Sequence, residues 1–275
     1  MSDIASRRRA FRALHESGCF VIPNPWDVGS ARLLVGLGFK ALATTSGGFA
    51  FSRGVPDGAV PLDEVLVHFR EIAGATDLPV NADFQGAYAD EPEGVAANVR
   101  SCVATGVSGL SVEDMKPDHS LYDFDVAVER VRAARSAIDA AGGDVLLTAR
   151  TESFVVGLAD PLREACRRLE AFADAGADVF FAPGALDGNV ISELVAAISP
   201  KPLNVMATPK NRSVAELAAL GVRRISVASA LARVALRGFL TAAREISDKG
   251  TFDAFATAEP AGDLNRFFAK GEWRK

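Results

Sequence analysis

Cysteine is scarce in this sequence of 275 residues, which contains only Cys19, Cys102 and Cys166. These residues lie far apart and form no C-x-x-C pair, so a disulfide framework and a cysteine-based zinc site are both excluded. An odd number of cysteines also fits a reducing compartment, and we expect the protein to be cytoplasmic.

Long apolar runs and an excess of positive charge are also missing. No uncharged apolar stretch approaches the roughly 18 residues of a membrane span, and no apolar core follows the basic residues near the start. The formal net charge is −5 at pH 7, which argues against a nucleic-acid-binding surface. We therefore expect a small molecule as the partner, with no nucleic acid and no membrane.

The composition is that of a chain with a large packed core. Hydrophobic residues make up 49% of the sequence and charged residues 24%, which excludes global disorder. The length fits an α/β barrel, a fold in which about 250 residues form one domain. We therefore treat residues 1–275 as a single domain.

Short apolar runs recur eight times, each followed by a polar or glycine-containing turn and an amphipathic helix. They lie at residues 19–23, 41–45, 79–83, 109–114, 144–150, 178–182, 202–207 and 224–229. Continuous apolar runs are typical of parallel strands that are buried on both faces. Eight such units without a long linker predict an α/β fold, a closed (β/α)₈ TIM barrel. An open dinucleotide-binding sheet is disfavoured, because the first turn reads PNPWDVGS and has no G-x-G-x-x-G.

Helix-start signals fall between these runs. Asp160 precedes a proline, Ser213 stands three residues before a glutamate, and Asp90 repeats the same logic. Residues 231–275 form a predicted C-terminal helical extension with several aromatic residues that either cover the barrel base or pack on a neighbouring subunit. We favour a homo-oligomer, a dimer or tetramer. The aromatic residues are Phe252, Phe255, Phe267, Phe268 and Trp273.

Polar residues at the carboxyl ends of the predicted strands are the candidates for a site, because barrel active sites form there. They include Trp26, Ser46, Gly47, Gly48, Asn81, Asp83, Glu113, Arg150, Glu152 and Asn204.

A metal and an acid ligand are the natural occupants of such a set. Asp83 and Glu113 end neighbouring strands, and such a carboxylate pair suits a hard divalent cation held partly through water. Arg150 follows on the next strand with a guanidinium fork for a carboxylate. The small-residue turn at Ser46, Gly47 and Gly48 can turn backbone N–H groups toward an anion. The set predicts a pocket for a small 2-oxo or 2-hydroxy acid and Mg²⁺, or Mn²⁺ in its place.

The sequence resembles the isocitrate lyase/phosphoenolpyruvate mutase superfamily. TTSGG, GVPDG, NADFQGAY, SVEDM and LLTART occur in the same order as in that superfamily, from about Phe11 to Leu240. The resemblance implies a barrel enzyme that binds Mg²⁺ and a 2-oxo acid or its enolate, and cleaves C–C or P–C bonds. The resemblance implies that the substrate carboxylate is bound by Ser46, Gly47, Gly48 and Arg150. It implies that Asp57 lies beside the metal and the substrate and that Asp83 and Glu113 hold Mg²⁺ through waters. It also implies that Asn204 is a polar position on strand seven.

Three departures from the superfamily pattern affect the expected chemistry. Asn81 replaces the first aspartate of a D-x-D motif, so an uncharged amide oxygen takes a metal-ligand position and a lower metal affinity is expected. The lyase loop with a catalytic cysteine is replaced by MKPDHS, which contains His119, and a P-E-A motif is replaced by APG at residues 182–184. The proton donor is therefore open among Tyr88, Glu152, Lys116 and His119, and His119 has the most suitable ordinary pKa.

These observations predict a Mg²⁺-dependent C–C lyase or decarboxylase that acts on a small 2-oxo or 2-hydroxy (di)carboxylic acid through an enolate. Arg150, Asp57, His119 and Glu152 are the catalytic candidates. One alternative is a P–C bond enzyme, a phosphonopyruvate hydrolase or a mutase, for which Lys210 and Arg212 supply positive charge. The other is a catalytically weak protein that binds 2-oxo acids.

Overall fold

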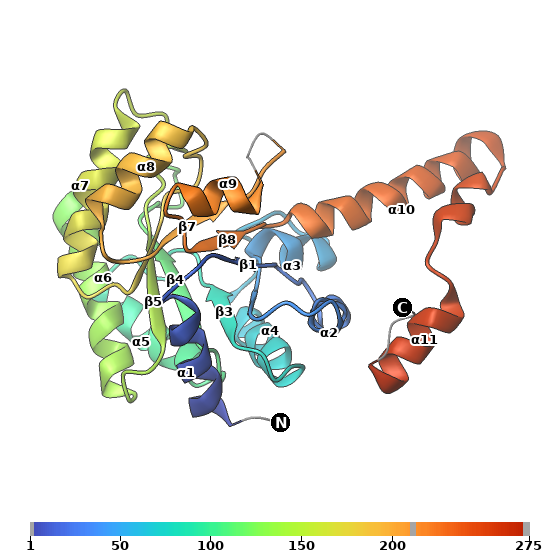
Figure 1. Ribbon diagram of the computed structural model, residues 1–275, viewed down its shortest axis with the longest axis horizontal. Coiled ribbons are helices and arrows are strands. Elements are labelled where there is room, and N and C mark those ends of the chain that lie inside the picture. The colour runs from blue at the N-terminus through green and yellow to red at the C-terminus, as the bar shows by residue number, and fades with distance from the viewer. Residues whose placement is uncertain (1–2, 210–212, 272–275) are drawn as a thin grey trace.

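The computed structural model describes residues 3–209 and 213–271 and has eight parallel strands in one sheet, ordered β1-β8-β7-β6-β5-β4-β3-β2 (Figure 1). Each strand falls inside one of the eight predicted apolar runs, so the barrel prediction is confirmed. The strands are β1 Phe20–Ile22, β2 Leu42–Ala43, β3 Val80–Asp83, β4 Gly109–Glu113, β5 Leu146–Arg150, β6 Val179–Phe181, β7 Leu203–Met206 and β8 Arg224–Ser226.

Helices surround the strands and connect them (Figure 1). They are α1 Ile4–Leu14, α2 Val28–Gly36, α3 Ser46–Ser52, α4 Leu62–Gly74, α5 Pro92–Val103, α6 Phe124–Ala140, α7 Pro161–Asp174, α8 Gly188–Ala197, α9 Val214–Ala219, α10 Ala230–Lys249 and α11 Ala261–Lys270, with a 3₁₀ helix at Asp253–Thr257. No helix in the described part of the chain is long and apolar enough to cross a membrane.

Polar contacts join the two edges of the sheet and nearly close the barrel. The N–H of Ala43 donates to the carbonyl of Pro23 at 3.0 Å, which links β2 to the end of β1. The Asn24 side chain donates to the carbonyl of Thr44 at 2.8 Å and accepts from the N–H of Val227 at 2.9 Å. Asn24 thus ties the ends of β1, β2 and β8 together.

Two apolar clusters hold the fold. The larger one lies between the strands and the outer helices, as expected for strands buried on both faces. The smaller one contains Phe11 of α1 together with residues of the strands, among them Ile22, Ala43 and Val179. Phe11 is fully buried in it, so α1 covers one end of the barrel.

The C-terminal extension predicted from residue 231 consists, in its described part, of α10, the 3₁₀ helix and α11 joined by short non-helical connections. Helix α10 runs away from the barrel and the chain turns at its far end (Figure 1). Phe252 and Phe255 are more than half exposed, whereas Phe267 is buried. Phe268 lies under the Arg32 guanidinium, so part of the aromatic set packs on α2 of the same chain. Trp273 lies outside the described residues.

Two of the three predicted helix starts are confirmed. Asp160 accepts from the N–H of Arg163 at the start of α7, and Ser213 forms a capping box at the start of α9. The third is wrong. Helix α5 has Glu91 at its N-cap, and the Asp90 carboxylate instead accepts from the hydroxyl of Tyr122.

Candidate active site

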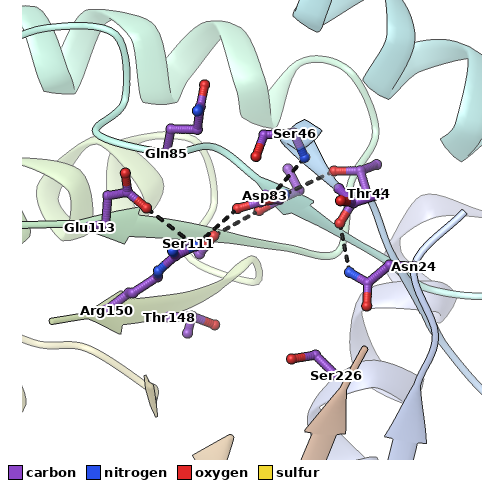
Figure 2. A network of polar contacts seen from close by, with 12 residues as sticks. Asn24, Thr44, Ser46, Asp83, Gln85, Ser111, Glu113, Thr148, Arg150 and Ser226 are labelled. Carbon is purple, nitrogen blue, oxygen red and sulfur yellow. Dashed lines mark hydrogen bonds and ion pairs between the residues drawn. The ribbon is translucent and has the colours of Figure 1, made fainter. Parts of the chain in front are cut away.

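Three charged side chains from neighbouring strands meet at the carboxyl end of the barrel. Asp83 comes from β3, Glu113 from β4 and Arg150 from β5, and all three point toward one another in Figure 2. Nη1 of Arg150 lies 3.2 Å from Oε2 of Glu113 and 3.6 Å from Oδ1 of Asp83. The structure therefore brings together the residues predicted for the metal and for the acid carboxylate.

Glu152 is the fourth member of the charge cluster and contacts Arg150. Its carboxylate accepts from Nε of Arg150, and its own N–H donates to Oδ1 of Asp114 at 2.9 Å. Asp114 also pairs with Arg168 of α7 at 3.1 Å, and both of these side chains are almost fully buried. Glu152 is thus held by a buried pair behind the site and orients Arg150.

The carboxylates outnumber the nearby cations, and their pKa values reflect this. Burial raises the pKa of Glu113 to about 7, an effect that Arg150 opposes and Glu152 and Asp83 reinforce. Burial likewise raises the pKa of Glu152 despite Arg150. Burial alone would lower the pKa of Arg150, but Glu113, Glu152 and Asp83 raise it, so the guanidinium stays charged.

Ser46 and Gly47 lie in the first turn of helix α3, where a small-residue turn was expected. The N–H of Ser46 donates to Oδ2 of Asp83 at 2.9 Å, and the N–H of Gly48 donates to the hydroxyl of Thr45 at 3.2 Å. Two of the N–H groups predicted to face an anion are therefore already paired. Their role in this structure is to fix Asp83 and the start of α3.

Glycine is required at position 48 for steric reasons. A Cβ there would lie 2.6 Å from Cγ2 of Thr45, 3.1 Å from Cβ of Trp26 and 3.3 Å from Cβ of Ala232. Trp26 therefore packs beside α3 and the start of α10, at the edge of the site. It does not line the central cavity described below.

Asp57 reaches the site from the segment after α3. Its carboxylate hydrogen-bonds to the hydroxyl of Ser46 and lies where a side chain at Gly47 would stand, because Oδ2 is 3.0 Å from that Cβ position. The pKa of Asp57 is raised, mainly by partial burial and also by Asp83. The placement by metal and substrate that the resemblance implies therefore fits this geometry.

The donor set at this end of the barrel fits a hard divalent cation. Within residues 3–209 and 213–271, no group of three or more His, Cys, Asp or Glu side chains is arranged to hold a metal. One nitrogen of Arg150 nevertheless lies within ion-pair distance of both Asp83 and Glu113, so a single cation can approach both. Mg²⁺ in proteins keeps several waters and uses one or two carboxylates, which is the number available here.

Asn81 lies deeper in the barrel than Asp83. Both side chains line the central cavity, as expected for positions two apart on one strand. Oδ1 of Asn81 is buried and has no hydrogen-bond partner among the described residues, and it lies 2.7 Å from where a Cβ on Gly109 would stand. It is therefore an acceptor that a ligand, a water or a metal can use.

A strained loop after β3 carries Tyr88. Gln85, Ala87 and Tyr88 all have positive φ angles, of 48°, 57° and 55°, which are rare for residues other than glycine. Arg130 of α6 holds this loop by donating to the carbonyls of Gly86, Ala89 and Asp90. The sequence reasoning missed Arg130, because a contact between α6 and this loop spans more than forty residues.

Tyr88 lies near the carboxylates, because it lines one pocket together with Asp83 and another together with Glu113, although it does not line the central cavity. Its hydroxyl donates to Oε1 of Gln85 at 2.8 Å. Burial raises its pKa above the ordinary value, and Asp83, Asp57 and Glu113 raise it further. The hydroxyl therefore keeps its proton beside the charge cluster.

His119 and Lys116, the other proton-donor candidates, are placed differently. His119 is exposed in a loop with a φ angle of 63° and lies outside the cavity that Asp83 and Arg150 line. Lys116 lines a separate pocket next to Glu113 and Tyr88. The structure therefore brings Lys116 near the cluster but does not bring His119 there.

The inner end of the central cavity has its own polar network around Arg224 of β8. Nε of Arg224 donates to Oδ1 of Asn204 at 2.9 Å, and Nη2 donates to the hydroxyl of Thr148 at 3.1 Å. Asn204 in turn donates to the hydroxyl of Ser226 at 3.0 Å. Burial lowers the pKa of Arg224 to about 9. The sequence reasoning missed Arg224, since it weighed the ends of strands and Arg224 stands at the start of one.

The family of the chain follows from comparison with known sequences. The sequence model of the family described as phosphoenolpyruvate phosphomutase matches residues 11–247. The chain belongs to the isocitrate lyase/phosphoenolpyruvate mutase superfamily. The resemblance drawn from its motifs is therefore confirmed, and with it the prediction of an enzyme of this type.

Relatives in this superfamily include named lyases and decarboxylases. A 2-methylisocitrate lyase of Escherichia coli K12 is 30% identical over 191 residues, which cover 65% of this chain and 62% of that one. An oxaloacetate decarboxylase of Pseudomonas savastanoi pv. phaseolicola is 31% identical over 231 residues, covering 78% and 76%. These proteins show the breadth of reactions among relatives of similar identity.

Solved structures show the same architecture. A protein described as a candidate lyase/mutase from Burkholderia cenocepacia J2315 is 44% identical, with a TM-score of 0.93 and 98% of both chains covered. The structure of a 2,3-dimethylmalate lyase is 28% identical, with a TM-score of 0.84 and coverage of 97% and 95%. The superfamily fold thus extends over nearly the whole chain, including the C-terminal helices.

Proposed function

We propose that this superfamily member is a Mg²⁺-dependent C–C lyase or decarboxylase that acts on a small 2-oxo or 2-hydroxy (di)carboxylic acid through an enolate. The observation that carries the proposal is the position of Arg150, one nitrogen of which lies within ion-pair distance of both Asp83 and Glu113. An acid-rich cluster around one arginine suits a cation and a carboxylate together. The activities named for the lyase and decarboxylase relatives support the same reaction class.

Asp83 and Glu113 would hold the metal, with waters and the Asn81 amide oxygen available nearby. When bound, Mg²⁺ supplies Lewis-acid stabilisation of negative charge on the oxygen of the oxo group. The Ser46 N–H keeps Asp83 oriented for this role. Asp57 adds a further negative charge close to Asp83, and a cation relieves the repulsion between them.

Arg150 would bind the carboxylate of the acid. In the structure Nε of Arg150 contacts Glu152, and Nη1 contacts both Glu113 and Asp83. A cation that neutralises Glu113 and Asp83 would make the guanidinium available to the carboxylate of a ligand. The same guanidinium stabilises the charge that develops when the bond beside the oxo group breaks. Glu152, held by the N–H contact to Asp114, fixes the plane of the guanidinium.

Tyr88 is our candidate for the proton that converts the enolate to product. It is protonated, it lines pockets that Asp83 and Glu113 also line, and the loop that carries it is held in a strained conformation. Donation of this proton to the enolate carbon leaves a tyrosinate at Tyr88, which takes a proton from solvent before the next turnover. His119 would have to move from its exposed position to serve instead.

Product formation tests the proposed reaction. The wild-type protein and an Arg150→Met variant, each with Mg²⁺, are incubated with 2-oxo and 2-hydroxy acids, and the mixtures are followed by ¹H NMR. We expect C–C cleavage of at least one acid by the wild type only. Release of phosphate or phosphite from a phosphonate, with no acid cleaved, would favour the P–C alternative. Binding without any product over hours would favour a binding protein. Lys210 and Arg212, the residues considered for a phosphonate, lie outside the described residues.

We also propose that the chain forms a homo-oligomer through α10. Val234 and Phe239 on this helix are more than two-thirds exposed, and Leu240 and Ile246 are also exposed. Such an apolar surface is typical of a subunit interface. Light scattering after size exclusion tests this: we expect a dimer or tetramer, and we expect Phe239→Glu to shift the protein to smaller species. A monomeric wild type would contradict the proposal.

A further inference from the structure

One cavity connects the charge cluster at the mouth of the barrel with Arg224 further inside. Its lining includes Asp83 and Arg150 near one end and Thr148, Asn204 and Arg224 at the other. Figure 2 shows Thr148, whose hydroxyl accepts from Arg224, on the same strand as Arg150. The cavity measures about 80 Å³. Since roughly 10–15 Å³ holds one water, it has room for an acid of a few carbon atoms.

Arg224 is buried among neutral groups only. Its three nitrogens contact the Asn204 amide oxygen, the Thr148 hydroxyl and Nε2 of His15, the last at 3.4 Å. His15 is neutral here, because burial and Arg224 lower its pKa to about 3. Its Nδ1 lies 2.8 Å from the carbonyl of Phe11, so Nε2 is left as the acceptor for Arg224. Among residues 3–209 and 213–271, no ion pair to Arg224 is found.

A buried guanidinium with only neutral partners is unstable relative to one paired with an anion. Arg130, which is also buried and has no ion pair in the described part of the chain, differs because it stacks on Tyr122 and holds a loop outside the central cavity. Arg224 itself lines the cavity. Its guanidinium has five N–H donors, and each of the three nitrogens contacts one neutral group, which leaves two donors for a ligand. A carboxylate that enters the cavity therefore finds donors there in a fork geometry.

We infer that Arg224 binds the second carboxylate of the substrate, so that the cavity selects short dicarboxylic acids, with one carboxylate at Arg150 and the other at Arg224. The inference rests on the proposed function, because it takes the Arg150 end as the site of the first carboxylate. It deepens that proposal by fixing the substrate class. Thr148 and Asn204 position the guanidinium between the two strands that carry them.

A pair of matched ligands tests the inference. Malate and 2-hydroxybutyrate have the same carbon skeleton and hydroxyl group, and they differ only in the second carboxylate. Titration calorimetry with Mg²⁺ measures both ligands on the wild-type protein, Arg224→Met, Arg224→Lys and Arg150→Met. We expect the wild type to prefer malate by at least about tenfold, as typical for a charge-assisted fork. Arg224→Met abolishes this preference by weakening malate alone, and Arg224→Lys weakens malate less.

The outcomes separate the two proposals. Arg150→Met weakens both ligands if the proposed function holds, and unchanged binding of both would contradict that function. An equal effect of Arg224→Met on both ligands, or no effect, would overturn the inference while the proposed function stands. Should Arg224→Met fail to fold, the wild type still decides: no preference for malate over 2-hydroxybutyrate overturns the inference.

Discussion

Glu113 and Arg150 occupy paired positions on β4 and β5, and Oε2 of the glutamate lies 3.2 Å from Nη1 of the arginine. The pair joins the predicted metal end of the site to its carboxylate-binding end. We expect Arg150→Lys to lower kcat/KM by about 10²-fold or more, because a lysine has no fork for a carboxylate. Steady-state kinetics on the cleaved acid measures this, and a loss of less than threefold would contradict the assigned role.

Tyr88 and His119 can be separated by substitution. We expect Tyr88→Phe to lower kcat by about 10²-fold, the lower range for loss of a general acid, with little change in fold because Gln85 is the one hydrogen-bond partner of the hydroxyl in the described structure. We expect His119→Ala to keep nearly full activity, because His119 is exposed outside the cavity. Full activity of Tyr88→Phe with inactive His119→Ala would reverse the assignment.

The packing at Gly48 predicts a stability change. In Gly48→Ala the new methyl group meets Thr45, Trp26 and Ala232, and we expect a loss of about 1–3 kcal/mol in the free energy of unfolding. Gly74→Ala is the matched control, because nothing lies within 4 Å of its Cβ position, and it should be neutral or stabilising by up to about 1 kcal/mol. Urea unfolding measures both, and equal effects of the two would contradict the packing argument.

The buried pair of Asp114 and Arg168 predicts a larger effect. Asp114→Asn removes the buried partner of Nη1 of Arg168, which in the described part of the chain keeps only its ion pair with the less buried Glu164, and we expect a loss of about 3 kcal/mol. Arg132→Met is the control, because its contact with Glu129 is about half exposed and worth about 1 kcal/mol or less. The double variant Asp114→Asn/Arg168→Met should recover part of the loss. An additive double variant in urea unfolding would show that the two residues act independently.

His15 gives the protein a pH-dependent stability of known sign. Its pKa in the folded chain is lowered to about 3, mainly by burial, whereas the ordinary value is 6.5. Below pH 6.5 the unfolded chain binds a proton at His15 that the folded chain does not, so stability falls as pH falls. Between pH 7.5 and 5.0 we expect this residue to contribute a loss of about 2 kcal/mol. His15→Gln should lose that much less over the same interval in urea unfolding, and an unchanged pH dependence would contradict the assignment.

The barrel was largely predictable because its pattern is local. A strand buried on both faces must be apolar along its whole length, so each of β1 to β8 is marked in the sequence. Helix α3 was less predictable: the glycines at 47 and 48 indicated a turn, but the Thr45 hydroxyl accepts from the N–H of Gly48 and caps a helix there. Phe11 of α1 packs against the strands at one end of the barrel. This contact is a tertiary one, so no local sequence pattern indicates it.

The site was predictable only in part. Asp83, Glu113 and Arg150 could be placed together, since the ends of neighbouring parallel strands meet at one edge of the sheet. Arg224 could have been found from the alternation along β8, where Arg224 and Ser226 share the inner face. The hydrogen bonds from Arg130 to the loop after β3 are long-range contacts, and no spacing in the sequence indicates them.

The most direct test of the account is the melting temperature of the wild-type protein with a panel of 2-oxo and 2-hydroxy acids. Each acid is measured with Mg²⁺ and with EDTA, and products are read by NMR from the same samples. We expect at least one acid to raise the melting temperature by mass action and to be cleaved, with EDTA removing both effects. A protein that neither binds nor cleaves any acid of the panel in the presence of Mg²⁺ would contradict the central claim.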